Sequence, residues 1–155
     1  MTEELLEAWR TNHRINLMLI DAISDEGMVC TLSKRGGRDV ARQFAHLHNV
    51  RIWQLERRAK DLAEGLVIFE SKDSPSKDRL REALSASSSA VEQLLMGVLD
   101  GDAKRKGFKK GVFTTLSYFV AHESHHRGSI LLTLKQSGHA VPKDVAFGIW
   151  DWDRR

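Results

Sequence analysis

The chain carries three histidines within five residues, in the string His122-Glu123-Ser124-His125-His126. On a helix, residues four apart lie on the same face, so His122 and His126 can offer two nitrogen atoms to one metal ion. The string also reads H-E-x-x-H, the pattern of zinc hydrolases in which the glutamate is the general base. The spacing therefore predicts metal binding, and the origin of the third ligand decides which kind of site this is.

A second pair of histidines, His46 and His48, lies in another segment with helical periodicity. His48 lies among apolar residues on the strongest apolar face of that segment, and the helical wheel favours it as the third ligand. His46 lies beside Val50 and Trp53, toward the edge of the same face. The spacing leaves both residues open, and we expect the other one to have a structural or supporting role.

The remaining histidines are weaker candidates. His125 lies about 60° from His122 on the same wheel, so it borders the expected site and could bond to a ligand. His13 and His139 belong to no such pattern, and we expect them at the surface or in loops. The side chains on the helical face around His122 and His126 are small and polar, which is typical of a cavity wall. They include Thr115, Tyr118, Ser129 and Thr133.

A metalloprotease is one alternative interpretation of H-E-x-x-H. Metzincins need a glycine and a third histidine at fixed offsets, where this chain has Ser129 and Leu132. Gluzincins need a downstream glutamate ligand, and no glutamate follows Glu123. No segment shows the strand pattern of the sheet that holds an extended peptide in such enzymes. We therefore expect the match to be accidental.

Four long segments show helical periodicity, which predicts an all-α fold, a four-helix bundle of the up-down type. The first, second and fourth helices are expected over about residues 2–23, 39–64 and 114–136. The third is expected to start at Ser74-Pro75 and to end at Gly101.

The ends of these segments carry specific signals. Asp39 is the expected cap of the second helix, Gly65 its end, and Gly138 the stop of the fourth. The tail over residues 141–155 holds Phe147, Trp150 and Trp152, too many aromatic residues for a disordered end. We expect this aromatic C-terminal tail to fold back over the bundle or to form an oligomer contact.

Length and composition set the broad class. The 155 residues predict a single domain over 1–155, with 41% hydrophobic and 29% charged residues as in ordinary globular proteins. Cys30 is the only cysteine, which favours a reducing, cytoplasmic location. No apolar stretch approaches the roughly 20 residues that cross a membrane. The basic run over residues 104–110 lacks any nucleic-acid-binding motif, so no nucleic acid partner is expected.

These motifs together resemble the DinB/YfiT-like family of metal-binding four-helix proteins. The resemblance rests on the segments 40–51 (VARQFAHLHNVR) and 122–128 (HESHHRG), on the Gly138 turn and on the tail segment 148–152 (GIWDW), so it covers nearly the whole chain. It implies a three-histidine site formed by His46, His122 and His126, and so favours His46 over His48. Ser129 departs from the family pattern, which often has glutamine there.

The resemblance also implies a function. Three histidines with open coordination positions are typical of a catalytic site, and the metal is expected to be Zn, Ni or Fe. The implied activity is that of a metal-dependent transferase or hydrolase, with a low-molecular-weight thiol as a further cofactor in thiol-dependent members. The alternative is a non-catalytic bundle with structural histidines or a structural metal. A small-molecule substrate and a homodimer are the expected partners, without a membrane.

Overall fold

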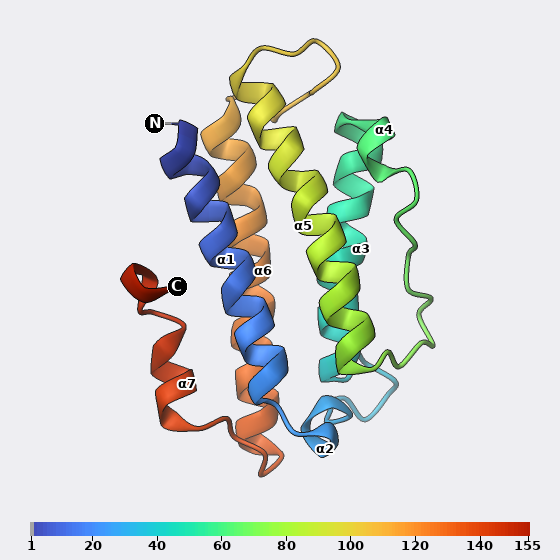
Figure 1. Cartoon of the computed structure of the whole chain (residues 1–155). Coiled ribbons are helices and arrows are strands. Elements are labelled where there is room, and N and C mark those ends of the chain that lie inside the picture. Colours follow the sequence, from blue (N-terminus) through green and yellow to red (C-terminus); the bar gives the residue numbers. More distant parts are fainter. Residues whose placement is uncertain (1) are drawn as a thin grey trace.

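The computed structural model describes residues 2–155, which form a bundle of helices (Figure 1). It confirms the predicted all-α four-helix bundle. The four long helices are α1 (Thr2–Ala22), α3 (Val40–Arg58), α5 (Lys77–Leu99) and α6 (Val112–Gln136). The short ones are α2 (Asp25–Met28), α4 (Lys60–Ala63), α7 (Lys143–Gly148) and a 3-10 turn at Trp152–Arg154.

Local capping signals explain most helix ends. The carboxylate of Asp39 accepts a hydrogen bond from the backbone N–H of Arg42 at 2.8 Å, as expected for the cap of α3. Gly65 has φ +81° and follows α4, in agreement with its predicted role as a stop. The third helix begins later than predicted, because Ser76 rather than Ser74 accepts the capping hydrogen bond, from Arg79.

The second predicted helix is broken in the structure at Ala59, which separates α3 from α4. Ala59 has φ −162° and ψ 66°, outside the helical region. The carbonyl of Arg58 accepts a hydrogen bond from the backbone N–H of Lys106 at 2.9 Å instead of one from the next helical turn. This contact with a distant loop cannot be read from the local periodicity, which predicted one helix to residue 64.

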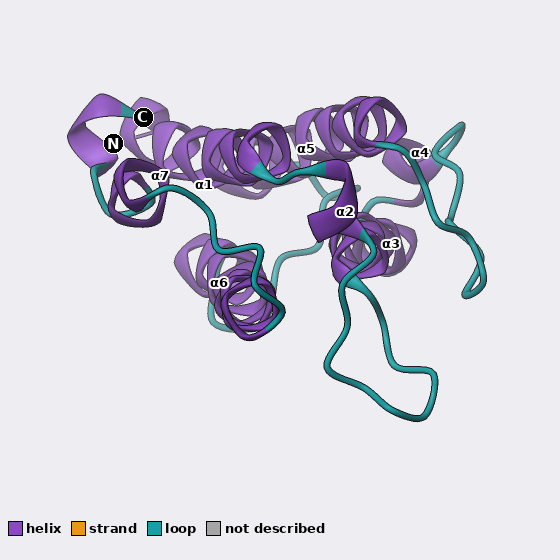
Figure 2. Cartoon of the chain, turned by 90° about the horizontal axis from the view of Figure 1, so that it is seen from below, coloured by secondary structure: helices purple, strands orange, loops and turns teal. Residues whose placement is uncertain are grey.

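The long helices form two layers (Figure 2). α1 packs against α5 and α6, and α3 packs against the same two helices, so α1 and α3 are diagonal in the bundle. Figure 1 shows that α3 and α5 run in one direction while α1 and α6 run in the other. A long connection over residues 64–76, which we call the strap, returns along the outside of α3 and makes this arrangement possible.

Two hydrophobic clusters fill the interior, with a buried polar layer between them. One cluster surrounds Phe44 and Ile130, and the other surrounds Trp9 and Phe119. The polar layer is centred on the Arg51–Glu123 ion pair, whose side chains are 0% and 1% exposed. The polar layer therefore separates the two hydrophobic clusters along the bundle axis.

The aromatic tail folds back along α1, one of the two arrangements expected for it. α7 contacts α1, and Arg14 donates a hydrogen bond to the carbonyl of Arg155 at 2.7 Å. Phe147 and Trp150 remain 73% and 76% exposed. Across residues 2–155, every helix is too short or too polar to span a bilayer. The single domain over 1–155 and the homodimer stay predictions.

Candidate metal centre

Three histidines from two antiparallel helices converge at one side of the bundle. His46 comes from α3, and His122 and His126 come from successive turns of α6. Each offers one ring nitrogen, and these three atoms lie within 4.8 Å of one another. The ring centroids are 4.7–5.4 Å apart. The fold thus brings together the residues that the family resemblance implied, and we call them the histidine cluster.

The rings of the histidine cluster are held in the neutral form that metal ligation needs. Burial, with a smaller effect of the Arg38 charge, lowers the pKa of His46 to about 4. Burial and the neighbouring His122 lower the pKa of His126 to about 4, and burial also lowers the pKa of His122. Within residues 2–155, none of the three rings makes a hydrogen bond. Their nitrogen lone pairs are therefore free at neutral pH.

These donors fit a divalent transition-metal ion. Zn–N bonds of about 2.0 Å require ligand nitrogens about 3.3 Å apart in a tetrahedral site, so modest rotation of the imidazoles brings the cluster to that spacing. The side chains are half-buried, which leaves room for such rotation. Imidazole nitrogen suits zinc, nickel, iron and copper alike, so the donor set does not select among them.

Aromatic rings border the histidine cluster. Trp53 contacts His46 edge-on at a centroid distance of 6.0 Å, and Tyr118 stacks on His122 at 6.1 Å. The Tyr118 hydroxyl accepts a hydrogen bond from Gln54 of α3, which ties it across the two helices. His125 is exposed and touches His126 from outside, so it borders the cluster as expected.

His48 lies on another face of α3 and does not join the cluster. It is 1% exposed, and its Nε2 atom lies 3.0 Å from the carbonyl oxygen of Val67 in the strap. Two residues along a helix correspond to a rotation of about 200°, so His46 and His48 must face different neighbours. The apolar face that favoured His48 on the wheel is covered by the strap and α5, whereas the histidine pair lies on α6.

Glu123 points into the core and is not available as a general base. Its Oε1 and Oε2 atoms accept hydrogen bonds from Arg51 at 2.7 and 3.0 Å, and Oε2 also accepts from Asn12 and Asn16 at 2.7 Å. Burial alone raises the pKa of this carboxyl, but the charge and hydrogen bonds of Arg51 outweigh it and hold the pKa below its usual value. Glu123 therefore lies away from the histidine cluster, and its position does not support the H-E-x-x-H interpretation.

The polar layer around Glu123 joins all four long helices and was missed in the sequence. Arg127 donates to Asn16 at 2.9 Å, and Arg51 donates to the carbonyl of Leu84 in α5 at 2.8 Å. One sequence feature could have indicated this layer: Asn12 and Asn16 lie four residues apart among the apolar positions of α1. Paired amides within an apolar face indicate a buried polar partner.

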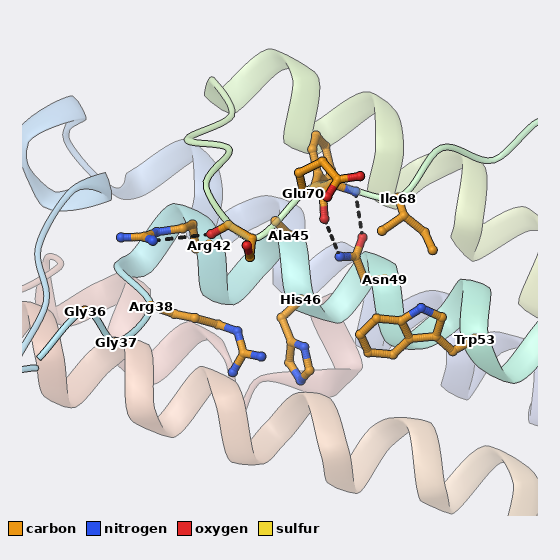
Figure 3. A pocket seen from close by; sticks show the side chains of 12 residues that line it. Gly36, Gly37, Arg38, Arg42, Ala45, His46, Asn49, Trp53, Ile68 and Glu70 are labelled. Atoms are coloured by element: carbon orange, nitrogen blue, oxygen red, sulfur yellow. Dashed lines mark hydrogen bonds between the residues drawn. The ribbon is translucent and has the colours of Figure 1, made fainter.

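A cavity of about 520 Å³ opens beside His46. Figure 3 shows it between α3, the loop before α3 and the strap. The Asn49 side chain fixes the strap, since it donates to the carbonyl of Phe69 at 2.8 Å and accepts from the Phe69 N–H at 3.0 Å. The Asn49 amide therefore helps to hold the strap residues that line one side of the cavity, residues 68–71.

The chain matches a known protein family over almost its entire length. The sequence model of the DinB family matches residues 1–152. Neither a curated protein nor a solved structure matches the chain. The family match covers the four long helices and the whole histidine cluster.

Proposed function

Because the chain belongs to the DinB family, we propose that it binds one divalent metal ion through His46, His122 and His126. The convergence of three ring nitrogens within 4.8 Å is the observation that supports this most strongly. The lowered pKa values add support, because ligation needs neutral imidazole. The ion can be zinc, nickel or iron, all of which this donor set accepts.

We further propose that the chain is an enzyme, a metal-dependent transferase or hydrolase. A divalent ion with open coordination positions supplies Lewis acidity and lowers the pKa of a bound water or thiol. The chain contributes three uncharged ligands, which leave the charge of the ion intact, and a cavity beside His46 that can hold a substrate. A low-molecular-weight thiol is the proposed co-substrate.

The alternative of a structural metal has less support. The two hydrophobic clusters and the Arg51–Glu123 layer hold the four helices together without any contribution from the histidine cluster. The cluster itself lies at a half-exposed edge of α3 and α6. We therefore expect protein treated with a chelator to stay folded, with an unchanged far-UV circular dichroism spectrum. Unfolding on metal removal would favour the structural role.

Metal content of protein without a histidine tag tests the site directly. After loading with zinc, nickel or iron and dialysis, we expect about one ion per chain by elemental analysis. His46→Ala, His122→Ala and His126→Ala should each lose most of the metal. His125→Ala removes an exposed neighbour of the cluster and is the matched control, so it should keep the metal.

Substitution of His48 tests the assignment within α3. We expect His48→Ala to keep its metal, since its ring contacts the strap and not the cluster. Loss of metal in His48→Ala together with retention in His46→Ala would contradict the proposed ligand set. Circular dichroism of each variant excludes unfolding as the cause.

The enzyme proposal has a separate test. Metal-loaded protein should transfer cysteine to an aromatic halide faster than the metal-free protein does, as followed by absorbance. The His122→Ala variant should fall to the uncatalysed rate, while His125→Ala should keep the activity. The same rates should be measured with several thiols and with ester substrates. If the metal-loaded protein and His122→Ala react equally fast with all of them, the enzyme proposal is contradicted, although the metal-binding proposal still stands.

A further inference from the structure

Arg38 lies in the cavity wall next to the histidine cluster. It belongs to the loop between α2 and α3, and Figure 3 shows its side chain extending along the cavity beside His46. The guanidinium is close enough for its charge to act on both His46 and His126. Arg38 is therefore an exposed residue beside the histidine cluster, in the wall of the cavity that His46 also lines.

Arg38 differs from its basic neighbour in the cavity wall because its charge is not paired. Arg42 forms an ion pair with Asp39 at 3.3 Å and donates to the carbonyl of Ser71. Over residues 2–155, the Arg38 side chain has neither an ion pair nor a hydrogen bond. A guanidinium has five N–H donors in a planar fork, which suits a carboxylate bound through both oxygens.

The charges around the cavity favour an anion. Among the lining residues, Glu70 is the one acid, and Figure 3 shows it on the strap, away from Arg38. The nearby Glu123 is already neutralised by Arg51 in the core. A divalent ion bound by the histidine cluster adds two further positive charges. A positive concave surface of this kind concentrates anionic ligands.

The opposite end of the cavity is apolar. Trp53 of α3 and Ile68 of the strap line it, and the bonds from Asn49 to the strap hold this wall in place. Figure 3 shows His46 between Arg38 and Trp53 along α3. The volume of about 520 Å³ is within the range of small-molecule sites. A ligand that reaches from the guanidinium to the indole therefore passes His46, the member of the histidine cluster that lines the cavity.

We propose that Arg38 is an anion-binding residue of this cavity and that its ligand is a small carboxylate with an apolar or aromatic group. The carboxylate pairs with the Arg38 guanidinium, and the apolar group packs between Trp53 and Ile68. The inference rests on the proposed function in one respect, that the bound ligand is presented to a metal held by the histidine cluster. Pairing with Arg38 itself does not require the metal.

Calorimetric titration with two matched compounds tests this subsite. 3-Phenylpropionate carries the carboxylate and the aromatic ring, whereas 3-phenylpropanamide has the same shape without the charge. Both are titrated into zinc-loaded and metal-free full-length protein. We expect the carboxylate to bind about 10-fold more tightly than the amide, because a charge-assisted bidentate pair is worth roughly that much.

Arg38→Gln should weaken binding of 3-phenylpropionate about 10-fold and leave binding of the amide unchanged. Arg35→Gln is the matched control, since Arg35 is exposed in the same loop but does not line the cavity. It should behave as wild type. Metal content and circular dichroism are measured on the same samples.

The possible results separate this inference from the metal proposal. Equal affinities for the two compounds, no binding of either, or an unchanged affinity in Arg38→Gln would overturn the anion subsite, whatever the zinc content. Binding that depends on Arg38 in protein that takes up no zinc would instead support the subsite and contradict the metal site.

Discussion

His122 and Glu123 are neighbours in the chain with opposite environments. Successive residues of a helix are rotated by about 100°, so His122 faces His46 of α3 while Glu123 faces Arg51 in the core. Both groups are nevertheless controlled by burial. Burial lowers the pKa of the His122 imidazole and so favours its neutral form. Burial also disfavours the charged form of the Glu123 carboxylate, which stays ionised because Arg51 is its partner. At the scale of the residue, side-chain direction decides the chemistry.

His13 on α1 shows the same control by burial, although its sequence position suggested the surface. Its Nδ1 atom is buried without a hydrogen-bond partner within residues 2–155. Burial, together with the positive charge of Arg51, lowers the pKa of His13 to about 4. The folded protein therefore resists protonation of this ring at pH values where the unfolded chain accepts a proton.

This difference predicts a loss of stability at acidic pH. The folded pKa is below the unfolded value of about 6.5, so the contribution of His13 to stability declines as pH falls from about 7.5 to 4. Urea unfolding in a chelator should show that the wild type loses about 2 kcal/mol more than His13→Asn between pH 7.5 and 5. The exposed His139→Asn is the control, and an equal loss in His13→Asn would contradict the prediction.

At the scale of the element, the strap turns one face of α3 into a cavity wall. Three side chains of α3 bond to its backbone: His48 contacts the Val67 carbonyl, Asn49 pairs with both backbone groups of Phe69, and Arg42 donates to the Ser71 carbonyl. The buried Phe69 ring adds an apolar contact with the core. The paired amide replaces the hydrogen bonds that a neighbouring strand would provide. The shape of the cavity beside the histidine cluster therefore depends on the attachment of this irregular segment.

Asn49→Ala should release the strap without unfolding the bundle. It leaves the buried N–H and C=O of Phe69 without partners, which costs about 1–3 kcal/mol of unfolding free energy. Hydrogen exchange at the Phe69 amide should become faster, while metal content stays unchanged. Glu56→Ala, an exposed substitution on the same helix, is the control. Unchanged protection of the Phe69 amide would show that other contacts hold the strap.

At the scale of the whole molecule, the buried polar layer sets how the four helices fit together. Arg51 from α3, Glu123 from α6, Asn16 from α1 and the Leu84 carbonyl of α5 form one connected network. Sliding or rotation of one helix would break several of these charge-assisted bonds at once. The layer therefore fixes α3 against α6, which also aligns His46 with the histidine pair.

Glu123→Gln should destabilise the fold by about 3–5 kcal/mol, because Arg51 is left buried without its counter-charge. Urea unfolding at neutral pH measures this loss. An apolar double variant, Arg51→Met with Glu123→Leu, removes both charges and should recover much of the stability. An exposed ion pair contributes less than about 1 kcal/mol. If Glu123→Gln lowers the free energy of unfolding by no more than that, the polar network does not determine how the helices pack.

Features that depend on local geometry could be predicted from the sequence. The helix ends at Asp39, Gly65 and Gly138 follow from capping and left-handed backbone preferences, and these act over a few residues. The shared face of His122 and His126 follows from helical spacing alone. The family resemblance added His46, which no local rule could choose over His48.

Features that depend on which helices are neighbours became visible in the folded protein. The break at Ala59 requires the loop at Lys106, and the strap that covers His48 is held by residues about 20 positions away. The core position of Glu123 requires Asn12, 111 residues distant in the chain. Periodicity gives each helix its apolar face but not the residues opposite it, so the chemistry of a face is settled only when the helices pack.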